Sequence, residues 1–173
     1  MGYLADKIIA YFGDGSQLGV KIDYFVEETP LGNAGALFRL RDKIGKEPFL
    51  LLNADAAFDV DFNRMVAFHK NHGGLVTLFT HPNSHPYDSG LIIADKNGNV
   101  EKWLAKEDKR PQWYDNRVNA GLHVIDPKAL DISLKSLEID EESSFPKGKV
   151  DLDRQILKPL CGSNMMFCYD SPE

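Results

Sequence analysis

One short apolar run, residues 49–55, decides the fold that the sequence predicts: FLLLNAD. Four consecutive apolar residues indicate a strand that is covered on both faces, because a strand with one face in water alternates apolar and polar side chains. Asp55 follows at the carboxyl end of this strand, the end at which open α/β sheets bind their ligands. We therefore expect an α/β protein with Asp55 in its binding site.

Strands and helices alternate on both sides of this run. Apolar residues at helical spacing predict helices over residues 4–12, 34–43 and 61–72, and alternating apolar residues predict a strand over 20–27. A second apolar run predicts a strand over 75–80. This order is typical of βαβ units, in which neighbouring strands are parallel.

The second half of the chain predicts antiparallel pairing. Residues 91–94 and 99–104 flank the tetrapeptide DKNG at 95–98, and Asn followed by Gly is a strong signal for a hairpin turn. The remaining predicted elements are a strand over 118–125, a helix near 152–160 and a strand near 165–169. No linker or repeat divides the chain. We expect one domain over residues 1–173, with a mixed, mainly parallel central sheet plus an antiparallel hairpin.

Composition and charge exclude several classes of protein. The chain has 173 residues, 43% of them hydrophobic and 27% charged, which is typical of a globular domain. Its 20 Lys and Arg against 26 Asp and Glu give a formal charge of −6, which disfavours binding to nucleic acid. No apolar run reaches the roughly 18 residues that span a bilayer, and the first residues lack a signal-peptide pattern. We expect a cytoplasmic protein that binds neither nucleic acid nor membranes.

A glycine-containing loop before the second predicted helix is a candidate ligand site. The backbone N–H groups of Gly32 and Asn33 could receive a phosphate group or the edge of a base, although Asn33 also suits an ordinary helix N-cap. Glu27, at the end of the preceding predicted strand, could accept two hydrogen bonds from guanine or could be a solvated charge. The residues alone leave these alternatives open.

Three carboxylates and five histidines complete the candidates. Asp55 is positioned to hold Mg²⁺ beside phosphate oxygens. For Asp59 and Asp61 we favour a solvated loop residue and a helix N-cap, but together they also form an Asp-x-Asp pattern of the kind found in glycosyltransferases. The histidines show no metal-ligand or general-base pattern, so we assign them surface or packing roles.

Three blocks of sequence, taken together, resemble one known family. They are EETPLGNAGAL at residues 27–37, LLNAD at 51–55 and NAGL at 119–122. Their order and content resemble the sugar-1-phosphate nucleotidyltransferases, or NDP-sugar pyrophosphorylases. The resemblance is strongest to the branch that contains the mannose-1-phosphate and heptose-1-phosphate guanylyltransferases, and it extends over nearly the whole chain.

The resemblance implies a Rossmann-like nucleotidyltransferase fold and an activity. In this family a sugar 1-phosphate, here mannose or heptose 1-phosphate, attacks the α-phosphorus of a nucleoside triphosphate, here GTP, to give an NDP-sugar and pyrophosphate. Mg²⁺ is the implied cofactor, and Asp55 is the implied catalytic residue and metal ligand. The implied nucleotide-binding residues are Glu27, Gly32 and Asn33, and the implied sugar-phosphate-binding residues are Gly90, Lys106, Asn119 and Gly121.

The sequence also departs from the family pattern. The family's glycine-rich loop and Lys-Pro segment would precede Tyr3, and its second metal carboxylate would follow Glu173. Ala54 stands where the family has glycine, and Ala105 stands where it has glutamate. We expect a central fragment that is inactive alone, and a homo-oligomer that covers an exposed sheet edge. The alternatives are a non-catalytic regulatory subunit, which Ala54 and Ala105 favour, and an Asp-x-Asp glycosyltransferase.

Overall fold

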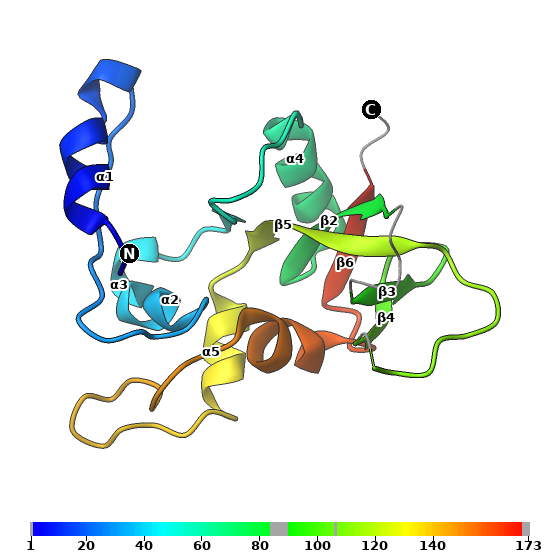
Figure 1. Cartoon of the computed structure of the whole chain (residues 1–173). Helices are drawn as coiled ribbons and strands as arrows, with labels where there is room; N and C mark the ends of the chain where they lie inside the picture. Colours follow the sequence, from blue (N-terminus) through cyan, green and yellow to red (C-terminus); the bar gives the residue numbers. More distant parts are fainter. Residues whose placement is uncertain (1, 84–89, 106, 171–173) are drawn as a thin grey trace.

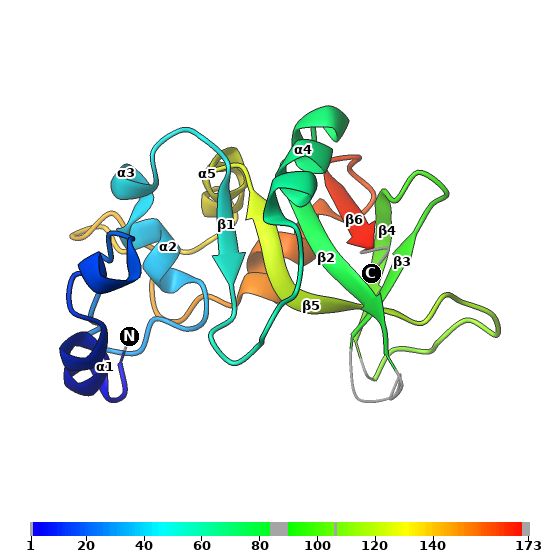
Figure 2. The same ribbon diagram turned by 90° about the horizontal axis from the view of Figure 1, so that it is seen from above.

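The computed structural model describes residues 2–83, 90–105 and 107–170, which form a mixed sheet with helices on both faces (Figures 1 and 2). The strands are β1 (Phe49–Leu52), β2 (Val76–Pro82), β3 (Leu91–Ala94), β4 (Val100–Leu104), β5 (Arg117–Ile125) and β6 (Met166–Asp170). The helices are α1 (Ala5–Phe12), α2 (Gly35–Arg39), α3 (Arg41–Ile44), α4 (Phe62–His72) and α5 (Lys128–Leu134). Shorter helical segments are η1 (Ser16–Leu18), η3 (Leu152–Leu157) and η4 (Lys158–Leu160). The predicted α/β class with a mixed sheet is confirmed.

Strand β5 is the centre of the sheet. The strand order is β4-β3-β5-β2-β6, and β1 pairs with β5 outside this path. The β2–β6 pair is parallel, whereas β1–β5, β2–β5, β3–β4 and β3–β5 are antiparallel. The prediction of a mainly parallel sheet is therefore wrong. Segment β1-α4-β2 does join two strands of the same direction, but β5 lies between them, and short-range patterns do not show which strand inserts there.

The strand predicted over residues 20–27 does not form. This segment pairs with no strand in the described part of the chain, and none of its residues is buried. The end of α1 holds it: Ile22 N–H donates to the Asp14 carbonyl at 2.8 Å, and Tyr24 Oη donates to the Gly13 carbonyl at 2.6 Å. The prediction is wrong because alternating apolar residues form a strand only where a neighbour supplies hydrogen bonds.

The other predicted elements form near their predicted positions, but β1 is not the strand covered on both faces that was predicted. Among the described strands it pairs with β5 alone, and Leu52 is 45% exposed. The helix predicted over residues 34–43 appears as α2 and α3, and the helix predicted near 152–160 appears as η3 and η4. The predicted hairpin is β3–β4, whose turn contains Gly98 with a φ of +80°. Asp95 Oδ1 accepts backbone hydrogen bonds from Asn97 and Asn99 in this turn, at 2.8 and 2.9 Å. Local turn chemistry therefore explains the hairpin.

Two apolar clusters fix the helices to opposite faces of the sheet. On one face, Met65 of α4 packs with Leu122 and Val124 of β5. On the other face, a larger cluster joins Ile125 of β5 to α2, α5 and η3. Figure 1 shows α4 above the sheet and α5 below it. Residues of β5 that alternate with Leu122 and Val124 therefore face η3.

Helix α1 lies apart from the sheet, beyond α2, in both views (Figures 1 and 2). Its Tyr11 and Phe12 rings meet edge to face, yet Tyr11 is 83% exposed. Much of the apolar surface of this helix therefore faces solvent. None of the helices in the described ranges has both the length and the apolar character needed to cross a membrane.

A clamp around Asp170 ties β6 to the rest of the sheet. Arg117 donates from Nε to Asp170 Oδ1 at 3.0 Å and from Nη2 to Asp170 Oδ2 at 2.5 Å. The buried Thr80 hydroxyl also donates to Asp170 Oδ1. The hydrogen bond to Asp170 raises the pKa of Arg117, so the pair stays charged. One carboxylate thus joins the ends of β2, β5 and β6.

We predict that Asp170→Asn lowers the free energy of unfolding by about 1–2 kcal/mol, because it removes a charge-assisted pair that also bonds Thr80. Asp131→Asn is the matched control, since Arg41 donates two bonds of 2.9 Å to Asp131 at the surface. The control should cost about 0.5 kcal/mol. Urea unfolding followed by circular dichroism measures both losses, and equal losses would contradict the clamp.

Candidate functional site

A cavity of about 490 Å³ lies between β5, the end of β4 and η3. It gathers predicted ligand-binding residues that are far apart in the sequence: Asn33, Gly90, Asn119 and Gly121. Residues that were not predicted also line it: Asn53, Trp103, Glu107, His123, Asp153, Arg154 and Lys158. Asn33 therefore lies with the predicted sugar-phosphate residues, whereas its predicted partners Glu27 and Gly32 are not in the lining.

The register between β2 and β5 shifts between Asn119 and His123, and Gly121 lies at this irregularity beside the cavity. Its φ is +81°, a left-handed conformation that favours glycine, and a Cβ atom there would overlap the Asn53 side chain. Asn53 N–H donates to the Gly121 carbonyl at 2.9 Å, and Gly121 N–H donates to Asn119 Oδ1 at 3.2 Å. The two asparagines therefore hold this part of β5 around a residue without a side chain.

The loop predicted to bind nucleotide is hydrogen-bonded to the segment that leads into η3. Ala34 N–H donates to the Val150 carbonyl at 3.1 Å, and Asn33 Oδ1 accepts from Leu152 N–H at 2.7 Å. Gly32 has a φ of +83°, and a Cβ atom there would overlap the Val150 backbone. Asn33 is thus not the N-cap of α2, which is Ala34, and its side chain instead positions the start of η3.

Segments η3 and η4 supply cations to the cavity. Asp151 Oδ1 accepts from Arg154 N–H at 2.8 Å, and Gln155 Oε1 accepts from Asp151 N–H at 2.7 Å, so two side chains cap η3 reciprocally. Arg154 and Lys158 both line the cavity. Asp153 lies in the same lining, and its pKa is raised by partial desolvation of the carboxyl group and by the charge of Asp151. The four-residue spacing of these cations on a predicted helix was a usable signal that sequence reasoning missed.

The end of β4 contributes an aromatic side chain and a carboxylate. A Cβ atom at Gly90 would lie 2.7 Å from Trp103 Nε1, so glycine at this position makes room for the indole. Beyond β4, Ala105 N–H donates to Asp108 Oδ2 at 2.8 Å. This turn leaves both Ala105 and Glu107 in the cavity lining. The cavity therefore has a carboxylate two residues after the alanine that departs from the family pattern.

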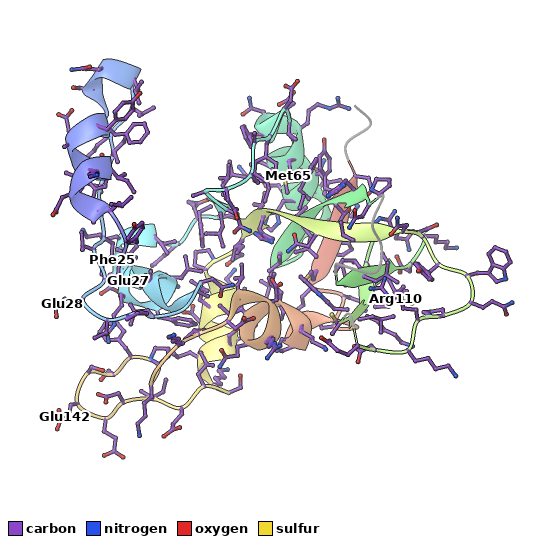
Figure 3. All side chains as sticks on the ribbon, in the orientation of Figure 1. Phe25, Glu27, Glu28, Met65, Arg110 and Glu142 are labelled. Carbon is purple, nitrogen blue, oxygen red and sulfur yellow. The ribbon has the colours of Figure 1, made fainter. Side chains whose placement is uncertain are left out.

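Glu27 lies in a different part of the molecule. Its Oε2 accepts from Leu31 N–H at 3.2 Å, and it lines a second hollow of about 280 Å³ together with Arg39. Figure 3 shows Glu27 beside α2 and below α1. Glu27 does not line the cavity between β5, the end of β4 and η3. The predicted sugar-phosphate residue Lys106 lies outside the described residues.

The carboxylates that follow β1 have different surroundings. Asp55 is exposed in the turn that begins at Asn53, and it does not line the cavity. In the part of the chain that the structure describes, no three His, Cys, Asp or Glu side chains are grouped to hold a metal ion. A single exposed carboxylate still fits Mg²⁺ that is held mainly by substrate phosphates and water. Asp61 is the N-cap of α4, as favoured above, since it accepts from Asn63 and Arg64 N–H at 2.9 and 3.1 Å.

Two of the histidines that the structure describes are buried, and their surroundings differ. His69 Nδ1 forms a 2.9 Å hydrogen bond with Thr77 Oγ1, which fits the packing role expected of histidines in this chain. His123 is 1% exposed and lines the cavity. Burial lowers the pKa of His123 to about 4, so its ring is neutral at pH 7. Sequence reasoning did not single out His123, because a lone histidine in an apolar strand forms no pattern.

Known proteins resemble this chain over most of its length. The mannose-1-phosphate guanylyltransferase catalytic subunit beta of Dictyostelium discoideum is 38% identical over 139 residues, which are 78% of this chain and 37% of that protein. Mannose-1-phosphate guanylyltransferase 1 of Arabidopsis thaliana is 36% identical over 138 residues, 76% of this chain and 37% of that protein. The chain thus spans little more than a third of the length of these relatives.

The fold has solved counterparts, and the sequence matches a family. HddC from Yersinia pseudotuberculosis, solved in complex with GMP-PN, superposes with a TM-score of 0.71 at 16% identity, covering 99% of this chain and 67% of that one. At this identity the likeness shows the fold alone. The sequence family described as nucleotidyl transferase matches residues 3–151, which include every predicted site residue. The resemblance found in the sequence is confirmed, and the chain belongs to the nucleotidyl transferase family.

Proposed function

We propose that the cavity binds a sugar 1-phosphate and that the protein transfers a nucleotidyl group to it from a nucleoside triphosphate, giving an NDP-sugar and pyrophosphate. One observation carries this proposal: the cavity brings Gly90, Asn119 and Gly121 together with the cations Arg154 and Lys158. The relatives named as mannose-1-phosphate guanylyltransferases support mannose 1-phosphate and GTP as the substrates.

The lining suits both ends of a sugar phosphate. Arg154 and Lys158 can donate charge-assisted hydrogen bonds to a phosphate group. Glu107 and Asp153 can accept hydrogen bonds from sugar hydroxyls, and the Asn119 amide can donate to them. The volume of about 490 Å³ lies within the range of small-molecule sites.

The reaction needs alignment and charge neutralisation more than a protein nucleophile. A phosphate oxygen of the sugar 1-phosphate bonds to the α-phosphorus of the triphosphate, and the bond from that phosphorus to pyrophosphate breaks. Arg154 and Lys158 hold the attacking phosphate in place. Members of this family generally use a divalent cation, and we propose Mg²⁺ held by Asp55, two residues beyond Asn53 of the lining. When bound, Mg²⁺ would neutralise charge on the phosphate oxygens.

The nucleotide side of the site is proposed to lie along the loop that contains Glu27, Gly32 and Asn33. The Glu27 carboxylate faces a hollow of about 280 Å³ and can accept from the N–H groups of guanine. The relatives named as mannose-1-phosphate guanylyltransferases support a guanine nucleotide. Asn33 connects the two sides, because it belongs to this loop and also lines the cavity.

The alternative functions have less support. An Asp-x-Asp glycosyltransferase would need Asp61 as a ligand, but Asp61 caps α4. A regulatory subunit was favoured partly by Ala105, but Glu107 restores a carboxylate to the lining. The homo-oligomer and the cytoplasmic location stay predictions, and light scattering on the purified chain measures the first of them.

We predict that Arg154→Gln and Lys158→Gln each weaken binding of mannose 1-phosphate about tenfold, because each removes a charge-assisted bond to phosphate. Isothermal titration calorimetry on the 173-residue chain measures this. Lys70→Gln, on the exposed surface of α4 at the opposite face of the sheet, is the matched control and should bind normally. Unchanged binding in both cavity variants would place the ligand elsewhere.

A second prediction compares two glycines. Gly121→Ala and Gly73→Ala both place a Cβ at a positive φ, +81° and +67°, but only the first meets Asn53. Both variants should lose about 1 kcal/mol of stability from backbone strain. Only Gly121→Ala should also abolish calorimetric binding of mannose 1-phosphate, because it displaces Asn53 into the cavity. Retained binding in that variant would show that β5 does not shape the site.

Turnover tests the proposal as a whole. Protein that contains this chain should release pyrophosphate from GTP and mannose 1-phosphate in a Mg²⁺-dependent manner. Asp55→Asn should lower kcat about 100-fold or more, as expected for loss of a group that holds neutralising charge at the phosphates. Asp59→Asn, a change to a nearby exposed carboxylate, should stay within about twofold. Sugar transfer from GDP-mannose without pyrophosphate chemistry would overturn the proposal.

A further inference from the structure

His123 occupies the face of β5 that borders the cavity. Leu122 and Val124, its neighbours in the strand, pack against Met65 of α4 on the other face. Side chains alternate along a strand, so His123 points to the face covered by η3. It lines the same cavity as Gly121, two residues earlier. The histidine is therefore part of the site through its position in the strand, and not through a mobile loop.

Within the described part of the chain, the ring of His123 lacks the hydrogen bonds that a buried histidine normally makes. Among the described residues, neither its Nδ1 nor its Nε2 has a hydrogen-bond partner, and both atoms are shielded from solvent. The Leu51 backbone lies near enough to oppose the fall in the pKa of His123, but it does not meet the geometry of a hydrogen bond. An unpaired buried polar group costs about 1–3 kcal/mol. Buried His69, by contrast, is paired with Thr77.

The protonation state of His123 limits what it can recognise. With a pKa of about 4 the ring is neutral at pH 7, so one nitrogen donates a hydrogen bond and the other accepts one. A sugar hydroxyl can donate a hydrogen bond to one ring nitrogen or accept one from the other, whereas a phosphate dianion can only accept. Arg154 and Lys158 in the same lining already provide positive charge for phosphate. The ring therefore suits the sugar end of the ligand.

We propose that His123 is a specificity-determining residue that hydrogen-bonds a hydroxyl group of the sugar bound in the cavity; this inference rests on the proposed function. The χ2 torsion of histidine is broad, so a modest ring rotation turns a nitrogen toward the occupant of the cavity. Binding then supplies the hydrogen-bond partner that the described residues do not. The chain keeps an unfavourable buried group because that group is used when the sugar binds.

The test substitutes both buried histidines. His123→Phe should keep or raise the midpoint of thermal unfolding, because it replaces an unpaired polar ring with an apolar one of similar size. It should weaken mannose 1-phosphate binding about tenfold in calorimetry and leave inorganic phosphate binding unchanged. His69→Phe is the matched control: it should lower the unfolding midpoint by removing the partner of Thr77 and leave mannose 1-phosphate binding unchanged.

A spectroscopic readout separates the possible outcomes. With ¹⁵N-labelled histidine, mannose 1-phosphate should shift the ring nitrogens of His123, and inorganic phosphate should not. Two results would overturn this inference and leave the proposed function standing. One is normal binding of mannose 1-phosphate with no change in the chemical shifts of His123. The other is an equal loss of affinity for mannose 1-phosphate and inorganic phosphate in His123→Phe. If the unmodified chain binds inorganic phosphate but not mannose 1-phosphate, the proposed function fails and the role of His123 fails with it.

Discussion

The pairing of β5 with β1 on one edge and with β2 on the other is the constraint on which the rest of the structure depends. In this register Leu122 and Val124 lie on the face covered by α4, and Gly121 and His123 lie on the face covered by η3. A slip of one residue would exchange the two sets of side chains. The smaller apolar cluster on one face, and the larger cluster with the polar cavity beside it on the other, therefore follow from the same hydrogen bonds.

A second set of hydrogen bonds joins the two halves of the chain. Val150 N–H donates to the Leu31 carbonyl at 2.8 Å, and Leu152 N–H donates to Asn33 Oδ1 at 2.7 Å. These bonds fix where η3 begins, and thereby where Arg154 meets the cavity. The block EETPLGNAGAL, which carried the family resemblance, thus has a structural role beside its proposed part in nucleotide binding: it holds the segment that supplies the cations.

Short-range patterns predicted most of the local structure. The apolar run at 49–52 is a strand, Asp61 caps α4, and a turn containing Gly98 closes the hairpin. These features depend on side-chain periodicity, caps and turns, which neighbouring residues decide. The strand predicted over 20–27 does not form, because alternating apolar and polar residues indicate an amphipathic segment but not the presence of a partner strand. The prediction of a mainly parallel sheet was wrong for a similar reason, since the insertion of β5 between β1 and β2 involves segments far apart in the chain.

The features of the candidate site also separate into those that local sequence predicts and those that depend on the tertiary structure. The sequence by itself determined the family, through motifs that include Asn119 and Gly121, and it determined the class and nearly all the elements of the fold, because motifs and periodicity are local. Only the tertiary structure decided that Arg154 and Lys158 line one cavity with those residues, and that His123 is buried there with no hydrogen-bond partner among the described residues. The physical reason is that burial, pKa and shared cavities depend on which distant side chains meet, and that is settled only when η3 packs across β5.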